Sequence, residues 1–251
     1  MQIGPHPATG RGAAARPARG LGPQLLRTYE ILRARNGHLG WWPGRTRIEV
    51  IVGAILTQNT AWSNVERAIA RLRAARLLSV AGLRRATDPQ LEAAIRPSGY
   101  FRQKRRKLRA FLALLDRAYG GSLARMARAP TAALRAELLA TWGIGPETAD
   151  SILLYAFGRP VFVVDAYTER IAMRHGWIHP PRRYDRLQAL FTRHLPTDAD
   201  LYNDYHAQLV WVGKHHCRPQ PRCHDCPLRV LPGRRQIPGG SRATEAPSAG
   251  R

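Results

Sequence analysis

The segment from Thr141 to Asp150, TWGIGPETAD, constrains the fold of this chain more than any other part of the sequence. It separates two apolar segments with helical spacing, ALRAELLA and SILLYAFG. A tight reversal between two helices is favoured because glycine tolerates positive φ and because proline suits the first turn of a helix. The segment therefore predicts a helical hairpin. Its residues either serve the turn alone or expose backbone N–H groups that hold a phosphate at the start of the second helix, and the spacing leaves both open.

Helical periodicity continues through most of the chain between residues 24 and 231. Two segments, IEVIVGAIL and VFVVD, are ambiguous because β-branched residues also suit strands. Both are short, and no hairpin signal flanks either of them. We therefore expect an all-α protein. No apolar run approaches the length that spans a bilayer, so we expect no membrane partner.

The charge of the chain predicts a polyanionic partner. Its formal net charge is +23, from 40 basic and 17 acidic residues. A GC-rich genome would explain why 37 of the 40 are arginine, but such a bias favours arginine over lysine more than basic over acidic residues. Residues 1–23 and 232–251 have the composition of disordered tails, and the first also resembles a transit peptide. The tails hold only 6 of the 23 charges, so the folded part is itself basic and nucleic acid is the expected partner.

Asp165 is the candidate catalytic residue. It follows the apolar run VFVV and precedes a helical segment, and Thr168 three residues on makes it a plausible helix N-cap. A carboxylate near a phosphate-binding hairpin is also placed to meet a sugar ring.

These motifs together resemble the helix-hairpin-helix and Gly-Pro-Asp segment of the endonuclease III superfamily of DNA base-excision glycosylases. The matching stretch is LLATWGIGPETADSILLYAFGRPVFVVDAYTERI, with EVIVGAILTQNT and PSGYFRQK upstream and a cysteine cluster downstream. The resemblance covers roughly residues 24–231. It implies a two-domain all-α fold with a six-helix barrel over residues 39–159 and a discontinuous second domain over 24–38 and 160–231. It also implies a monomer that binds double-stranded DNA with damaged bases and holds the flipped base in a cleft, with Asp165 at its edge.

Two positions depart from branches of this family. Members that also cut the strand carry a lysine in the hairpin helix, whose amine forms a Schiff base with the sugar. This chain has Glu147 at that place, so the resemblance implies a monofunctional glycosylase without lyase activity by that route. The adenine-mismatch branch also lacks the lysine but uses a glutamate where this chain has Gly53, which disfavours that branch.

The segment GHLGWWPGRTRIEV carries the expected base pocket. An arbitrary tryptophan pair is more often part of a core, but the segment is similar to the 3-methyladenine glycosylase branch of the superfamily, which also has a glutamate in the lysine place. The resemblance implies a pocket lined by Trp41, Trp42, Pro43 and Lys214. An electron-rich indole prefers a cationic alkylated purine to a neutral base by roughly 0.5–2 kcal/mol. Because a cationic base leaves readily, one carboxylate and an aromatic pocket suffice.

Further residues are expected to contact DNA. Gln58 and Tyr100 fall where family members place residues that fill the gap left by the flipped base, although a capping amide and a loop aromatic are the structural alternatives. The hairpin should contribute Gly143, Ile144, Gly145 and Thr148. The run 102–109, RQKRRKLR, is basic at six of eight positions and is either a solvated helix face or a phosphate contact.

All three cysteines, Cys217, Cys223 and Cys226, lie in HHCRPQPRCHDCPL. A disulfide framework is disfavoured in an intracellular protein. The family's iron–sulfur loop has the spacing C-x6-C-x2-C-x5-C, whereas this chain has C-x5-C-x2-C and Pro232 where the fourth cysteine would stand. A [4Fe–4S] cluster normally takes four thiolates, so a cluster completed by His215, His216 or His224, a zinc ion, and no metal all stay open. In each case the loop would be structural, because hydrolysis of an N-glycosidic bond needs no redox step.

We therefore expect a monofunctional DNA glycosylase of base excision repair, acting at the nucleoid in a bacterial cytoplasm and releasing alkylated purines such as 3-methyladenine. One alternative is a glycosylase for oxidised pyrimidines that cuts the strand weakly through another amine such as that of Lys214. The other is a non-catalytic helix-hairpin-helix protein that binds damaged or branched DNA. Replacement of Asp165 separates the last alternative, since only an enzyme would lose turnover while keeping its affinity for DNA.

Overall fold

The computed structural model describes residues 20–181 and 183–231. Over these residues the chain forms helices and short loops without any β-strand, which confirms the all-α prediction. The helices are α1 (Leu21–Asn36), α2 (Arg47–Leu56), α3 (Trp62–Ala74), α4 (Val80–Arg85), α5 (Asp88–Ile95), η1 (Arg96–Ser98), α6 (Phe101–Tyr119), α7 (Leu123–Met126), α8 (Thr131–Leu139), α9 (Pro146–Ser151), η2 (Ile152–Ala156), α10 (Ala166–Arg174), α11 (Tyr184–His194), α12 (Ala199–His215) and η3 (Pro227–Val230).

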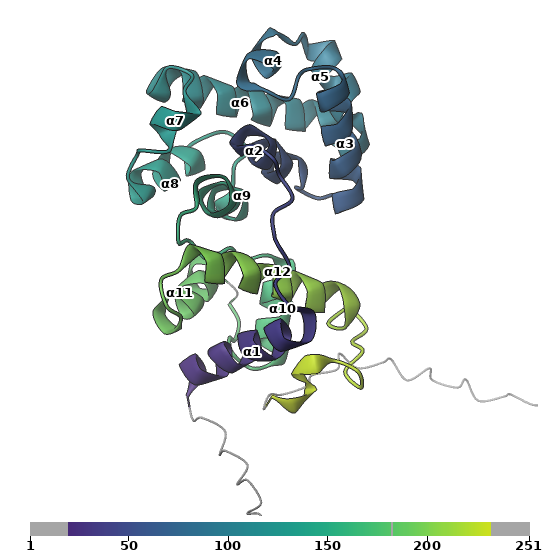
Figure 1. Cartoon of the computed structure of the whole chain (residues 1–251), viewed down its shortest axis with the longest axis vertical. Helices are drawn as coiled ribbons and strands as arrows, with labels where there is room; N and C mark the ends of the chain where they lie inside the picture. Colours follow the sequence, from purple (N-terminus) through teal and green to yellow (C-terminus); the bar gives the residue numbers. More distant parts are fainter. Residues whose placement is uncertain (1–19, 182, 232–251) are drawn as a thin grey trace, which may run out of the picture.

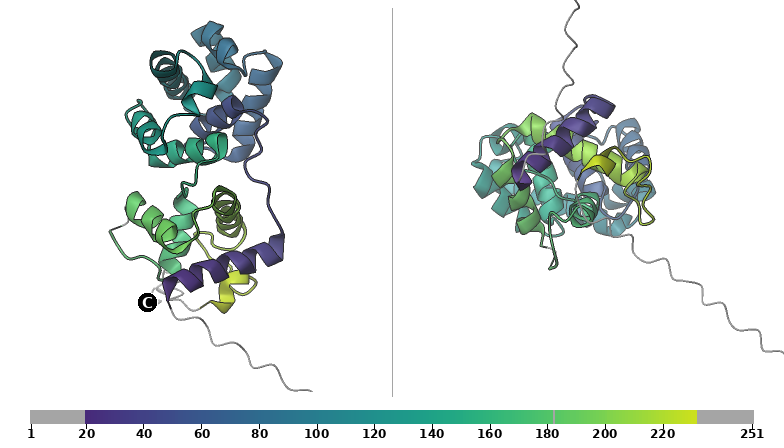
Figure 2. Two further views of the ribbon diagram at one scale, coloured as in Figure 1. Left: turned by 60° about the vertical axis from the view of Figure 1, so that its left-hand side comes forward. Right: turned by 90° about the horizontal axis from the view of Figure 1, so that it is seen from below.

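The helices are arranged in two lobes (Figure 1). The upper lobe contains α2 to α9, and the lower lobe contains α1 together with α10, α11 and α12. Two clusters of buried apolar side chains match this division, one drawn from residues 48–156 and the other from residues 25–32 and 154–231. Helix α1 lies across the underside of the lower lobe (Figure 2), where the Tyr205 hydroxyl donates a hydrogen bond of 2.8 Å to the backbone oxygen of Leu25. None of the described helices combines the length and the apolar character needed to cross a membrane.

The start of the chain differs in one detail from the expectation. Helix α1 begins at Leu21, three residues inside the expected disordered tail. The rest of that tail, and the expected tail from residue 232 on, lie outside the described residues.

The ambiguous segment IEVIVGAIL forms α2, the central helix of the upper lobe. The Thr46 side chain caps its start by accepting a hydrogen bond from the backbone N–H of Glu49. Every residue from Ile48 to Leu56 is buried, because α3, α6, α9 and η2 all pack around this helix. A helix that is apolar on all sides needs such an enclosed position, which explains why its periodicity was weak.

The second ambiguous segment, VFVVD, is neither helix nor strand. It crosses from η2 to α10 as extended chain and buries Phe162, Val163 and Val164 in the lower core. The Phe162 ring stacks on Phe191 with ring centroids 4.1 Å apart. This anchored segment delivers Asp165 to the first position before α10.

A buried carboxylate joins the hairpin to the lower lobe. Asp150 of α9 has no exposed surface and accepts two hydrogen bonds from Arg135 of α8, at 2.7 Å and 3.0 Å. From α11 of the lower lobe, the Tyr184 hydroxyl and the Gln188 amide donate to the same carboxylate at 2.8 Å and 2.7 Å. Four donors balance the cost of burying this charge and fix the hairpin against α11.

Candidate active site

A cleft of about 860 Å³ opens between the two lobes. The upper lobe contributes the loop before α2, the turn after it and the α8–α9 hairpin, and the lower lobe contributes Asp165 and one face of α12. Eight of the expected site residues line this cleft: Trp41, Trp42, Gln58, Gly143, Gly145, Thr148, Asp165 and Lys214. Three do not: Pro43 lies outside the lining, Ile144 is buried in the upper core, and Tyr100 is 66% exposed at the start of α6.

Asp165 is both a helix cap and a wall of the cleft. Its Oδ1 accepts hydrogen bonds from the backbone N–H and the hydroxyl of Thr168, at 2.7 Å and 2.9 Å. Its Oδ2 lies 3.7 Å from Nε2 of His206. Burial acts to raise the pKa of Asp165, but the nearby His206 ring and the two donors of Thr168 outweigh it and hold the pKa below its ordinary value. The carboxyl group is therefore ionised at neutral pH.

Two residues beside Asp165 were not expected from the sequence. His206 of α12 lies in the cleft, and its Nδ1 is 2.6 Å from the hydroxyl of Tyr155 in η2. A sequence signal for His206 exists in retrospect: His206, Val210 and Lys214 follow one another at intervals of four, share one face of α12, and all line the cleft.

Three indoles form the aromatic wall. The ring centroids of Trp41 and Trp42 are 5.7 Å apart, and that of Trp42 is 4.9 Å from Trp62, a residue that sequence reasoning missed. The Tyr155 ring also packs against Trp42, with ring centroids 5.0 Å apart. The Lys214 ammonium lies 5.8 Å from the centroid of Trp41. The three indoles therefore line the same cleft as the carboxylate of Asp165.

Of the two hairpin glycines, only Gly143 has a backbone conformation that favours glycine. Gly143 has a φ of 78°, in the left-handed region that favours glycine, and the Lys107 side chain fills the space where a Cβ would lie. Gly145 is extended, with a φ of −92°, and a Cβ there would meet no protein atom within 4 Å. Ile144 anchors the turn in the core.

Gln58 is bound to the hairpin. Its amide nitrogen donates to the backbone oxygen of Gly143 at 3.1 Å and to the hydroxyl of Thr148 at 2.8 Å, and its amide oxygen accepts from Lys107. Filling a gap in DNA would require this side chain to leave those partners.

Glu147 occupies the first turn of α9 and lines the cleft. Glu147 is an exposed residue, but the walls of the cleft around its carboxyl group partly desolvate that group. This burial, and then the charge of Asp165, raise the pKa of Glu147 to about 7, while His206 opposes the shift. Two carboxyl groups with separated pKa values therefore share one cleft.

Several basic side chains of the run 102–109 are already paired within the protein, so the run as a whole is neither a solvated helix face nor a phosphate-binding surface. Lys104 is buried and donates to the backbone oxygen of Ser98 at 2.6 Å, and burial lowers its pKa to about 8. Within the same run, Arg105 and Arg109 pair with Asp88. Much of this charge is used to hold α6 against its neighbours.

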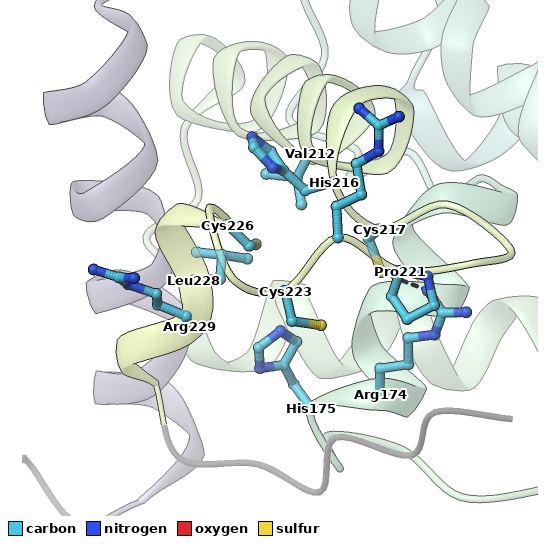
Figure 3. A pocket seen from close by; sticks show the side chains of 11 residues that line it. Arg174, His175, Val212, His216, Cys217, Pro221, Cys223, Cys226, Leu228 and Arg229 are labelled. Atoms are coloured by element: carbon cyan, nitrogen blue, oxygen red, sulfur yellow. Dashed lines mark hydrogen bonds between the residues drawn. The ribbon is translucent and has the colours of Figure 1, made fainter. Parts of the chain in front are cut away.

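The three cysteines line one small cavity of about 40 Å³ (Figure 3). All three are free, and Arg174 donates a hydrogen bond of 3.3 Å to Sγ of Cys217. Over residues 20–181 and 183–231, no group of three or more ligating side chains is arranged to hold a single metal ion. Three thiols on one cavity are the donor type that a [4Fe–4S] cluster takes, one fewer than its usual four, so a fourth ligand would have to be another residue.

The structure separates the three histidines considered for that corner. His216 lines the cysteine cavity, whereas His215 and His224 do not. His175 was not among the ligands expected from the sequence; it also lines the cavity and lies beside Cys223 (Figure 3).

Residues 52–197 match the family model for the HhH-GPD superfamily base excision DNA repair protein. A protein of Methanocaldococcus jannaschii that bears the name "Putative DNA repair glycosylase" is 44% identical over 207 residues, which cover 82% of this chain and 94% of the relative. Endonuclease III of Thermotoga maritima is 30% identical over 181 residues, covering 72% of this chain and 79% of that protein. The chain belongs to the HhH-GPD superfamily of base-excision repair proteins and is a DNA glycosylase, a hydrolase of N-glycosyl bonds.

Solved structures agree with this assignment. The H. pylori 3-methyladenine DNA glycosylase bound to 1,N6-ethenoadenine superposes with a TM-score of 0.65 at 27% identity, covering 74% of this chain and 97% of that one. An endonuclease III–DNA complex superposes with a TM-score of 0.71 at 23% identity, covering 84% and 94% of the two chains, and supports the fold. The relatives include an archaeal protein, so the expectation of a bacterial source stays an expectation.

Proposed function

We propose that this glycosylase releases cationic alkylated purines, such as 3-methyladenine, from double-stranded DNA. The observation that carries the proposal is the ionised carboxylate of Asp165 in the same cleft as the indoles of Trp41, Trp42 and Trp62. Indole faces favour a cationic base, and the carboxylate favours the cation that forms on the sugar. The similarity to the H. pylori 3-methyladenine glycosylase supports this substrate class.

The reaction needs few groups. The damaged nucleotide leaves the helix and its base packs on the aromatic wall. The N-glycosidic bond then breaks, and because the base was cationic it departs neutral, which leaves an oxocarbenium ion on the sugar. Asp165 stabilises that ion through Oδ2, and water adds to the anomeric carbon and releases a proton. No general acid is required for a leaving group that is already positive.

Strand cleavage is not part of the proposal. The place of the family's Schiff-base lysine is taken by Glu147, which has no amine. The second candidate function, a glycosylase for oxidised pyrimidines with weak lyase activity, draws support from Lys214, whose amine lines the same cleft. Borohydride trapping on an abasic duplex distinguishes the two, because only a Schiff base gives a covalent adduct.

Contacts with the rest of the DNA follow from the position of the cleft. The hairpin residues Gly143 to Thr148 would hold a backbone phosphate, with Gln58 and Tyr100 as candidates for the gap in the duplex. The enzyme would act as a monomer at the nucleoid.

A [4Fe–4S] cluster at Cys217, Cys223 and Cys226 would brace the loop after α12 and supply no chemistry to the hydrolysis. His216 would be the fourth ligand among the histidines considered from the sequence. Assays of iron and acid-labile sulfide on the purified protein test this.

The decisive experiment is base release from methylated duplex DNA, with chromatographic identification of the product. Wild type, Asp165→Asn and Asp198→Asn would be compared. Asp198 caps α12 by accepting from the backbone N–H of Leu201 at 2.8 Å, so it controls for changing a capping aspartate. We expect 3-methyladenine from wild type and Asp198→Asn only, with DNA affinity retained in all three. Release from a duplex with oxidised pyrimidines, and none from the methylated duplex, would replace the proposal with the second candidate. Binding without release from either duplex would make the protein a non-catalytic DNA binder.

A further inference from the structure

Tyr155 and His206 have no part in the reaction derived so far, although both lie beside Asp165. We propose that Tyr155 fixes the tautomer of His206, so that the Nε2–H of His206 points at Oδ2 of Asp165 and positions this carboxylate. The inference rests on the proposed function for the reaction that Asp165 performs, but the arrangement of protons is a property of the protein alone.

The two oxygens of the Asp165 carboxylate have different neighbours: Thr168 contacts Oδ1, and the His206 ring lies near Oδ2. Thr168 binds Oδ1 with two donors, which fixes that oxygen against the start of α10. Oδ2 lies 3.7 Å from His206 Nε2, and this nitrogen is buried with no hydrogen-bond partner among the described residues. A buried nitrogen without a partner is costly unless its charge or dipole is used. A proton on this nitrogen would place the positive end of the N–H dipole near the negative charge of the Asp165 carboxylate, which offsets that cost.

The Tyr155 hydroxyl decides which ring nitrogen carries the proton. It lies 2.6 Å from Nδ1. Burial raises the pKa of Tyr155 well above its ordinary value, and the charges of Asp165 and Glu147 act in the same direction, so the phenol keeps its proton and donates it. In a neutral imidazole an accepting Nδ1 requires a proton on Nε2. The other tautomer would turn a lone pair toward the carboxylate and repel it.

At 3.7 Å the Nε2–H is too far from Oδ2 for a hydrogen bond. It therefore orients the carboxylate through its dipole while leaving the Oδ2 lone pairs available to the sugar. The Tyr155 ring is itself held by Trp42, which links the aromatic wall to the carboxylate through His206.

Other charged groups also act on His206 and contribute to the pH dependence of the reaction rate. Glu147 of α9 and Asp165 face it from two other elements, and Lys214 lies two turns further along α12. Tyr155 is the titratable group in direct contact. Variants at Tyr155 change none of these charges at neutral pH, which makes that residue the cleanest probe.

The first test reads the tautomer without any substrate. Nitrogen-15 NMR of the His206 ring in the full-length protein would show a protonated Nε2 and an unprotonated Nδ1 in wild type. In Tyr155→Phe the two tautomers should mix. A proton on Nδ1 in wild type, whether Nε2 is bare or also protonated, would overturn the proposal whether or not the protein releases alkylated bases.

The second test is kinetic and uses single-turnover base release from methylated duplex between about pH 3 and about pH 8, a window that includes the acidic limb set by Asp165. We expect Tyr155→Phe and His206→Leu to lower the maximal rate roughly tenfold without changing the half-saturating protein concentration. The acidic limb should move to higher pH, because Asp165 loses the positive end of the His206 dipole, which favours its ionised form. His206→Gln keeps an N–H donor and should recover part of the rate.

Tyr205→Phe is the matched control. It removes one buried hydroxyl from the same helix α12, where the partner is the backbone of Leu25, away from the cleft. If the variants slow the reaction only as much as this control, or slow it without moving the acidic limb, their role is structural and the proposal fails. If wild type releases no alkylated base, the proposed function fails, and the NMR result still decides the proton arrangement.

Discussion

The indole of Trp42 lies against the backbone of Gly53, so closely that a Cβ atom at position 53 would come 3.3 Å from both Nε1 and Cζ2 of the ring. A long side chain at position 53 and Trp42 in its present place exclude each other. Gly53 therefore has a structural role beyond the absence of the glutamate that the adenine-mismatch branch has at this position. Its lack of a side chain provides the space that Trp42 occupies in the aromatic wall.

We expect Gly53→Ala to leave the free energy of unfolding within about 1 kcal/mol of wild type, since better helix propensity offsets a tight contact. The displaced Trp42 should nevertheless slow release of 3-methyladenine severalfold. Adding Trp42→Phe, which shortens the ring, should recover part of the loss in a double-mutant cycle. Strict additivity of the two changes would contradict the contact.

Asp165 should show its two roles separately. Asp165→Ala removes the cap of α10 and should cost about 1 kcal/mol of unfolding free energy, whereas Asp165→Asn keeps an oxygen for Thr168 and should cost less. Neither should release bases. Denaturant unfolding of both variants at neutral pH measures the difference, and equal stabilities would argue against the cap.

The stabilising part of the Asp165 charge should vanish in acid. Because folding lowers its pKa, this contribution is present above the unfolded value of about 3.9 and is lost as pH falls through the lower folded value. The stability advantage of wild type over Asp165→Asn should accordingly shrink on acidification below about pH 4.

Glu147 should make the choice of base depend on pH. With a pKa of about 7 it gains charge between mildly acidic and mildly alkaline pH, and this adds negative potential beside a cationic base. The ratio of affinities for methylated and unmodified duplex should therefore rise with pH in wild type and stay flat in Glu147→Gln. Repulsion between the Glu147 charge and the DNA backbone weakens binding of both duplexes and therefore cancels in this ratio. If the ratio rises with pH as steeply in Glu147→Gln as in wild type, Glu147 is not the cause of the pH dependence.

The two hairpin glycines form a matched pair. Gly143→Ala should cost about 1–2 kcal/mol of stability, because its φ is left-handed and Lys107 occupies the Cβ position. Gly145→Ala should leave stability unchanged, since its backbone is extended and its Cβ would be free. If the hairpin holds a phosphate, the second variant should still weaken DNA binding. Titration of duplex into both variants, with thermal unfolding alongside, checks both expectations.

Asp150 should be the most sensitive carboxylate of the fold. Asp150→Ala leaves Arg135, Tyr184 and Gln188 without their common acceptor and should cost about 3–5 kcal/mol. Asp116, which pairs with Arg84 on the surface, provides the control, and Asp116→Ala should change stability by less than about 1 kcal/mol. Chemical denaturation of the two variants makes the comparison.

Sequence reasoning reached the fold class and most of the cleft because these depend on local patterns. The hairpin glycines, Asp165 before a helix, and the paired tryptophans each have a signature within a few residues. Tyr155 has none, and the spacing of His206 with Val210 and Lys214 acquires its meaning only from the contact with Tyr155, 51 residues earlier. Trp62 was missed for the same reason. The charge of α6 was also misjudged, because no local signal tells that Lys104 turns inward to cap Ser98.

Helix α1 has a consequence for the order in which the protein forms. It is synthesised before every other described helix, whereas its partner α12 is the last of the described α-helices, and the bond from Tyr205 to Leu25 spans 180 residues. The helices of the upper lobe have their neighbours close in sequence, so they are free to fold while synthesis continues. A nascent chain that ends before α12 already carries the hairpin and Asp165 but lacks His206 and Lys214. During translation the hairpin thus precedes the completed cleft.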